Sequence, residues 1–343
     1  MSATRIEDTA RRQNKLFELA HKEALEIKPV GIRFRARGID PEKPCGEITF
    51  LPLPFAQCEV LSALTPAQRN VLSAMFFASV YRSIADAERR VTWMNMRTAE
   101  RSFKRWSDEY FVLHQETNEE YDHIHCFANI VRTCFGSAEP LGAEPFVFAC
   151  DEVIRPFSAQ LDDAGWGAFY LLHRLVANIA LKRGEAFLFH GMKPEDADPL
   201  AWEINRAHLS DEARHLTTSM EMGLGLYERA GRRSREIIKA AIRAISWMSI
   251  EHIFSTRKDE NTHGSALAHM AIRYAFAHPA FATIHQDADG LIARWRDWQY
   301  DDSEAFAAGK RWYARELGRV IDALEIKLPT YSESVERMKS LRA

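Results

Sequence analysis

Two histidines and a glutamate share one side of a predicted helix. In the segment NRAHLSDEARHLTTSM, residues 205–220, His208, Glu212 and His215 are spaced i, i+4 and i+7. On an α-helix these three side chains project from a single stripe, with apolar residues beside them. Imidazoles and a carboxylate are costly to desolvate without a partner, and a metal ion is such a partner. Taken alone, the segment also fits a solvated helix face.

The Glu-x-x-His step within this segment recurs along the chain. Four such steps occur, whereas roughly one is expected by chance at this histidine content. The steps at Glu18–His21 and Glu260–His263 lie in polar segments, and we set them aside. Those at Glu120–His123 and Glu212–His215 lie midway along long predicted helices with apolar flanks. The sequence therefore contains two helices that each offer a carboxylate and an imidazole.

Two further helices each offer a single glutamate. Glu185 is the only acidic residue of the most apolar predicted helix, residues 164–192, so it needs a charged partner if that helix is buried. Glu88 taken alone fits an exposed charge in its DAERR cluster. In chain order, however, Glu88, Glu120-x-x-His123, Glu185 and Glu212-x-x-His215 reproduce the ligand pattern of four-helix carboxylate bundles that bind two iron or manganese ions.

The spacing of these motifs fits antiparallel helix pairs. Intervals of 32 residues from Glu88 to Glu120 and 27 from Glu185 to Glu212 bring ligands near helix middles back to one height. Thr65, Pro66 and Gln68 predict the capped start of the first helix, which we expect to run for about 25 residues. The next helix is expected over roughly 105–135, and the last continues to about Tyr227.

Residues adjacent to the motifs are interpreted as supporting groups. Glu119 would lose the three-residue spacing, so Glu120 is the expected ligand. His125 lies about 200° around the helix from His123 and is expected to be structural or to support a ligand. Hydrogen-bond partners that orient the imidazoles are also expected. For each candidate, an exposed surface charge is an equally good interpretation. The candidates are Asp211, Asp122 and Arg214.

HLSDEARH, with a histidine four residues before the glutamate, resembles the ligand helix of the p-aminobenzoate N-oxygenase type of ferritin-like di-iron oxygenases. The resemblance covers about residues 65–220, and it implies seven ligands rather than the usual six, His208 being the addition. It implies two iron ions, with manganese possible, and O2 as co-substrate. The implied ligands are Glu88, Glu120, His123, Glu185, His208, Glu212 and His215.

The resemblance implies an oxidoreductase that N-oxygenates a small amine or amino-acid-derived substrate in a biosynthetic pathway. A peroxo-diferric intermediate would transfer the oxygen. A di-iron enzyme acting on carbon (hydroxylase, desaturase or oxidative cleavage) is the first alternative, and a ferroxidase or non-catalytic helical protein is the second. The chain has no dinucleotide fingerprint, so an external electron donor or reductase is expected. A homodimer is implied by the resemblance alone.

Composition supports a helical globular protein. Of 343 residues, only 16 are glycine and 13 are proline, which favours long helices over a many-turned β protein. A net charge of −3 gives no electrostatic case for nucleic acid or an anionic membrane as partner. Five scattered cysteines without a CxxC pair, no signal-peptide pattern and no membrane-length apolar run predict a cytoplasmic protein.

We therefore expect an all-α fold, a ferritin-like four-helix di-iron bundle with additional C-terminal helices and an extended N-terminal arm. The whole chain, residues 1–343, is expected to form a single domain. Its parts are an N-terminal helix and arm that includes a short strand pair (1–60), the metal-binding four-helix core (65–229), accessory helices (232–328) and a tail (329–343).

Overall fold

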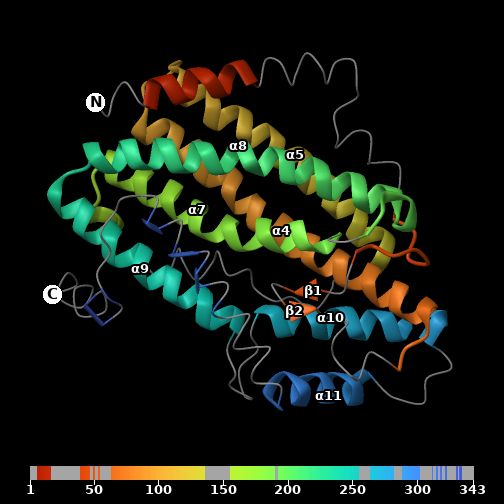
Figure 1. Ribbon diagram of the computed structural model, residues 1–343. Coiled ribbons are helices and arrows are strands. Elements are labelled where there is room, and N and C mark those ends of the chain that lie inside the picture. The colour runs from red at the N-terminus through yellow and green to blue at the C-terminus, as the bar shows by residue number, and fades with distance from the viewer. Residues whose placement is uncertain are drawn as a thin grey trace.

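Four long helices run side by side in the computed structural model (Figure 1). They are α4 (Pro66–Ser102), α5 (Asp108–Phe135), α7 (Asp163–Leu188) and α8 (Pro199–Arg229). Helix α4 packs along α5, α7 packs along α8, and α4 also contacts α7. The structure describes residues 6–16, 39–46, 49–50, 53–54, 63–135, 155–189, 192–254, 263–281 and 288–301, with isolated positions beyond residue 310.

Helix α4 begins as the sequence predicts and ends later. The Thr65 side chain accepts a hydrogen bond from the backbone N–H of Gln68, and the Gln68 side chain accepts one from the backbone of Thr65, which completes the capping box. The helix is 37 residues long, so the expected length of about 25 was wrong. Nothing between Met94 and Ser102 breaks a helix, and the chain turns only where Trp106 adopts a left-handed φ of 66°.

The interior of the bundle consists of two apolar clusters with a polar layer between them. One cluster includes Met94, Leu113, Phe169, Leu172 and Met222. The other includes Tyr81, Ile84, Phe127, Leu188 and Ile204. Along every helix of the bundle, the candidate ligand residues fall between a member of one cluster and a member of the other. Antiparallel packing therefore brings them to one height, as the intervals predicted.

The N-terminal arm holds the end of the bundle where α7 ends and α8 begins. The Asp198 carboxylate accepts hydrogen bonds from the backbone of Asp40 and of Ala201, so one side chain caps α8 and fastens the arm. Gly46 adopts a φ of 105°, and a Cβ there would lie 2.6 Å from the Leu188 carbonyl oxygen. The expected strand pair is present as β1 (Thr49–Phe50) and β2 (Leu53–Pro54), which are antiparallel.

Further helices cover the bundle on one side (Figure 1). Helix α9 (Arg232–Phe254) contacts α7, and α10 (His263–Ala277) contacts α4 and α11 (Ala288–Asp301). Short 3-10 turns η2 (Arg155–Gln160), η3 (Pro194–Asp196) and η4 (Pro279–Phe281) connect the helices. Most of the expected 304–324 helix and 329–343 tail lie outside the described residues.

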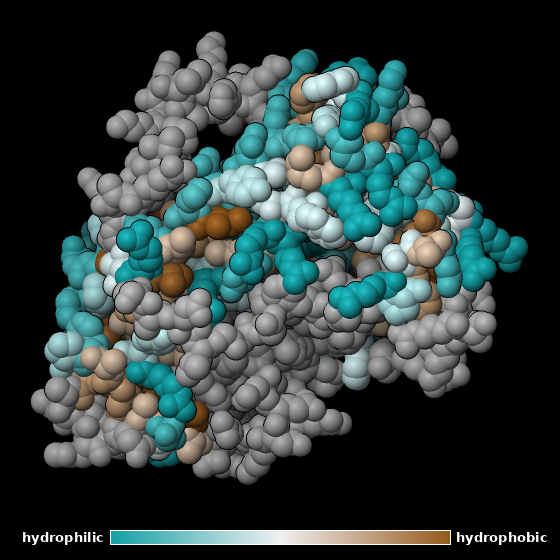
Figure 2. Space-filling model, turned by 180° about the vertical axis from the view of Figure 1, so that it is seen from behind, coloured by the Kyte–Doolittle hydropathy of each residue, from teal (hydrophilic) through white to brown (hydrophobic). Residues whose placement is uncertain are grey.

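The architecture agrees with the expected all-α, ferritin-like fold. Helices α4, α5, α7 and α8 all fall within the segment 65–229 that the sequence assigns to the core. On the face shown in Figure 2, hydrophilic residues cover much of the described surface, with smaller hydrophobic areas among them. No helix among the described residues is both long enough and apolar enough to cross a membrane.

Candidate metal centre

All seven candidate ligands are buried in the polar layer of the bundle. Each has a relative exposure of 5% or less. Glu88 comes from α4, the Glu120–His123 pair from α5, Glu185 from α7 and the remaining three from α8. The buried position of Glu88 differs from the exposed charge that its local sequence suggests, because His123 of α5 and His208 of α8 contact its carboxylate.

The first group of potential donor atoms forms around His208. Its Nε2 lies 3.0 Å from Glu88 Oε1 and 3.6 Å from Glu212 Oε1. His123 Nδ1 lies 3.4 Å from the same Glu88 oxygen. One donor atom from each of Glu88, His123, His208 and Glu212 lies within 4.8 Å of all the others. Four donors at this separation can surround a single cation.

A second group of potential donor atoms lies beside the first and shares Glu212 with it. His215 Nδ1 lies 2.9 Å from Glu212 Oε1 and 3.2 Å from Glu120 Oε1. Donor atoms of Glu120, Glu212 and His215 also lie within 4.8 Å of one another. Two adjacent groups of buried glutamates and histidines fit the ligand types of dinuclear carboxylate bundles.

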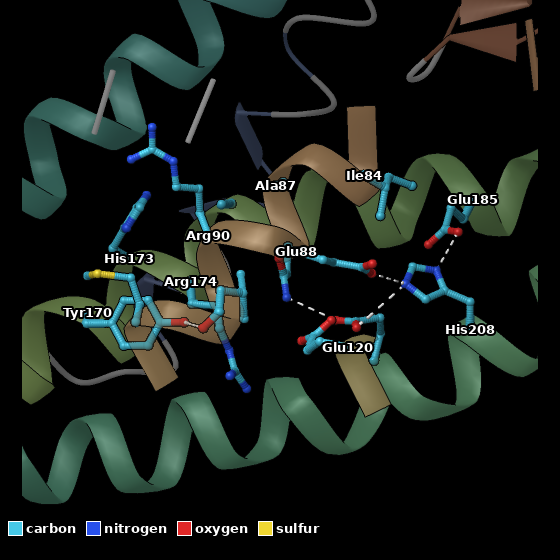
Figure 3. A pocket seen from close by; sticks show the side chains of 15 residues that line it. Ile84, Ala87, Glu88, Arg90, Glu120, Tyr170, His173, Arg174, Glu185 and His208 are labelled. Atoms are coloured by element: carbon cyan, nitrogen blue, oxygen red, sulfur yellow. Dashed lines mark hydrogen bonds and ion pairs between the residues drawn. The ribbon is translucent and has the colours of Figure 1, made fainter. Parts of the chain in front are cut away.

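Glu185 lies next to these groups but belongs to neither. Its Oε1 lies 2.7 Å from His208 Nδ1, on the opposite side of the ring from Glu88 (Figure 3). The structure therefore brings six of the seven predicted residues into the two groups. The remaining residue, Glu185, lies against the imidazole of His208.

The electrostatics of the layer favour positive charge. Burial alone lowers the pKa of His208, but the charge of Glu185 and hydrogen bonds to Glu185 and Glu88 outweigh burial and raise it to about 10. Burial also lowers the pKa of His215, and the Glu212 and Glu120 charges raise it well above its ordinary value. Four carboxylates therefore draw protons onto neighbouring imidazoles when no other cation is present.

The donor set fits iron or manganese. Three inward-facing atoms have no hydrogen-bond partner among the described residues: Glu88 Oε2, Glu120 Oε2 and His123 Nδ1. Buried polar atoms normally have partners, and a cation would supply one to all three. Carboxylate and imidazole ligands together suit iron and manganese. Neither group contains a cysteine thiolate.

Two imidazoles are oriented by carboxylates on the outside of the cluster. His123 Nε2 lies 3.1 Å from Asp211 Oδ2, and His215 Nε2 lies 2.9 Å from Glu119 Oε2. Arg214 donates to both of these carboxylates and so links the two pairs. With Nε2 engaged, Nδ1 of each ring faces the cluster, as expected for ligand histidines whose second nitrogen is fixed.

The sequence identified only part of this outer arrangement. Asp211 and Arg214 were candidates and lie in it, but Glu119 was rejected as a ligand and was not considered as a support. The Glu119–Glu120 doublet is the signal that could have indicated it, because consecutive positions point in different directions. Asp122 is half-buried. His125 is exposed, so its position does not support the structural or supporting role that was expected for it.

A second buried ionic layer lies one helical turn from the cluster. Arg174 Nη2 donates to Glu116 Oε2 at 2.7 Å and to the His215 carbonyl oxygen at 3.0 Å. Its other nitrogens donate to Asn95 Oδ1 and Ser219 Oγ, each at 2.8 Å. Burial lowers the pKa of Arg174, but the Glu116 charge outweighs this and raises it. No motif in the sequence indicated this layer.

A cavity opens beside the cluster and gives access to it (Figure 3). The space between its walls, including open solvent at the mouth, is about 660 Å³. Five candidate ligands line it: Glu88, Glu120, Glu185, His208 and Glu212. Apolar side chains form much of the remaining wall, namely Ile84, Ala87, Val91, Met94 and Ala177.

Comparison with known families agrees with this geometry. A family model described as P-aminobenzoate N-oxygenase AurF matches residues 36–293, which is most of the chain and includes all seven candidate ligands. Neither the curated proteins nor the solved structures gave a match. Because the family model covers far more than half of the sequence, the chain belongs to the P-aminobenzoate N-oxygenase AurF family, a family of di-iron oxidoreductases with a ferritin-like helical fold.

Proposed function

We propose that this protein is an oxygenase that holds two iron ions and uses O2 to oxygenate the nitrogen of a small amine. The observation that carries the proposal is the pair of buried donor groups that share Glu212. The overall change would convert an amine, O2, two electrons and two protons into a hydroxylamine and water. The electrons would come from an external donor or reductase.

The proposed ligands are the seven buried residues of the cluster. Glu88, His123, His208 and Glu212 would surround one ion, and Glu120, Glu212 and His215 the other. Glu185 is retained as a proposed ligand from the family resemblance; in the structure its carboxylate lies beside the two groups, against His208 Nδ1. A bound metal pair would pass electrons from the external donor to O2 next to the substrate nitrogen.

Protein side chains prepare the cluster for this role. Asp211 and Glu119 accept hydrogen bonds from Nε2 of His123 and His215 and so keep Nδ1 as the ligand atom. Asn178 donates to Glu212 Oε2 at 2.9 Å, which leaves Oε1 directed at the imidazoles. The apolar cavity wall admits a small uncharged amine while it limits access of bulk water.

Metal loading followed by an amine panel tests the proposal. The protein is loaded anaerobically with ferrous iron, given a chemical reductant and O2, and incubated with single-ring and aliphatic amines. We expect products one or two oxygen atoms heavier that return to the parent amine on chemical reduction, as N-oxygenated products do. Glu212→Ala is the matched control and should form none.

Products that keep their added oxygen after reduction would indicate oxidation at carbon and would contradict the proposal. Iron oxidation without any amine product, across the whole panel, would favour a ferroxidase. Both outcomes leave the metal cluster in place, so they test the substrate and not the fold.

A further inference from the structure

The cavity contains a buried histidine that the metal cluster does not use. His173 lies on α7 at the end of the cavity opposite His208 (Figure 3). Its relative exposure is 3%, and neither ring nitrogen has a hydrogen-bond partner among the described residues. Because a buried polar group without a partner costs free energy, an unpartnered imidazole on a cavity wall indicates a position where a ligand completes the hydrogen bonds.

The distance between His173 and the metal cluster sets the size of that ligand. His173 and Asn178 are five residues apart on α7, about 7.5 Å along the helix axis. Asn178 contacts Glu212, so its level is that of the cluster. A molecule that reaches both His173 and the cluster therefore has about the length of a single ring with a substituent at each end.

The surroundings of His173 fix its orientation and its chemistry. Phe169 stacks on the ring at a centroid distance of 5.8 Å and an interplanar angle of 18°. Burial lowers the pKa of His173 to about 4, so the ring is neutral near pH 7 and offers one N–H donor and one acceptor. The neighbouring Arg174 is already paired with Glu116. Arg90 also lines the cavity.

We propose that His173 determines substrate specificity by hydrogen bonding to an uncharged polar group on a single-ring amine, at the end opposite the amine. A carboxamide or a hydroxyl fits, because each can donate and accept, and the apolar wall between the two ends contacts the ring. This inference rests on the proposed function, since it assumes that the amine is directed at the cluster.

Binding measurements test the inference independently of turnover. The iron-loaded protein is titrated anaerobically by calorimetry with 4-aminobenzamide, 4-methylaniline and 4-aminobenzoate, which differ only at the end opposite the amine. We expect the amide to bind about tenfold or more tightly than the methyl compound. In His173→Phe that difference should fall to within about threefold, through weaker amide binding.

Two variants control the experiment. His114→Phe removes a partly buried histidine on α5 that does not line the cavity, and it should keep the tenfold difference. His173→Gln keeps a donor and an acceptor and should retain part of the preference for the amide. If His173→Phe does not fold, His173→Met replaces it.

An unchanged amide preference in His173→Phe or His173→Met would overturn the inference. So would binding of none of the three compounds, or strongest binding of 4-aminobenzoate with a preference that depends on Arg90 and not on His173. If the amide preference depends on His173 but no amine is N-oxygenated, the inference stands and the proposed function fails. The two ideas are therefore tested separately.

Discussion

Two buried ionic layers lie one turn apart in the same bundle, and they differ in charge balance. In the layer of Arg174 and Glu116, one cation meets one carboxylate, and the guanidinium also donates to Asn95, Ser219 and a backbone carbonyl. In the candidate metal cluster, four buried carboxylates face three buried imidazoles, so carboxylates are in excess.

The difference shows which buried charges are paired by other protein groups and which are left in excess. The Arg174 layer is close to neutral and makes a structural cross-link between α7, α5, α8 and α4. Even with all three imidazoles protonated, the four carboxylates leave the cluster with excess negative charge, which bound cations would neutralise. A buried layer with excess carboxylate therefore indicates a ligand-binding site, whereas a paired layer indicates a structural one.

Breaking the Arg174 layer should have the largest effect on stability. Arg174→Met leaves Glu116 buried and unpaired, which we expect to lower the free energy of unfolding by roughly 3–5 kcal/mol. Urea denaturation measures this change. Arg174→Met/Glu116→Gln should recover most of the loss, because it removes the unpaired charge. A loss below about 1 kcal/mol in the single variant would contradict the structural role of this layer.

His173 should contribute to the pH dependence of stability between about pH 4 and pH 6.5. Its pKa is about 4 in the folded protein and about 6.5 when unfolded, so the unfolded state binds the extra proton between these values. Its contribution is therefore present above pH 6.5 and lost as the pH falls toward 4, by about 3 kcal/mol. In denaturant titrations of the metal-free protein, His173→Phe should show a shallower fall in stability over this range. Equal slopes for both proteins would contradict it.

The outer carboxylates should have a smaller effect, on metal affinity. Glu119→Gln and Asp211→Asn each weaken the hydrogen bond that orients a ligand imidazole, and we expect iron affinity to fall about 10- to 100-fold. Competition with a ferrous chelator measures this. His125→Gln, at an exposed position on the same helix as Glu119, is the control and should be unchanged. A similar loss in His125→Gln would mean that the outer carboxylates are not specific supports.

The sequence predicted the four long helices of the bundle and which side chains share a helix face, because both follow from local spacing. Capping residues at Thr65 and Gln68 marked where α4 begins, and the Glu-x-x-His steps fixed which side chains share a face. The intervals between the motifs predicted that the candidate ligands lie at the same height along the bundle. The match of the family model to residues 36–293 agrees with the family resemblance inferred from those motifs.

Features that arise from contacts between helices were not predictable in this way. Glu119 supports His215 from another helix, and Arg174 reaches Glu116 across the bundle. The proposed role of His173 depends on the cavity that residues of α4 and α7 line beside it. The spacing also placed Glu185 at the right height without indicating that it faces His208 Nδ1. Packing between helices decides each of these, and local spacing does not record it.

The most direct test of a dinuclear centre is the iron stoichiometry of the anaerobically reconstituted protein, measured beside Glu212→Ala, which removes the carboxylate shared by both donor groups. We expect close to two ferrous ions per chain in the natural protein, the number that bundles with this ligand pattern hold, and fewer than one in the variant. One ion or none in the natural protein, or two in Glu212→Ala, would contradict a dinuclear centre at this position.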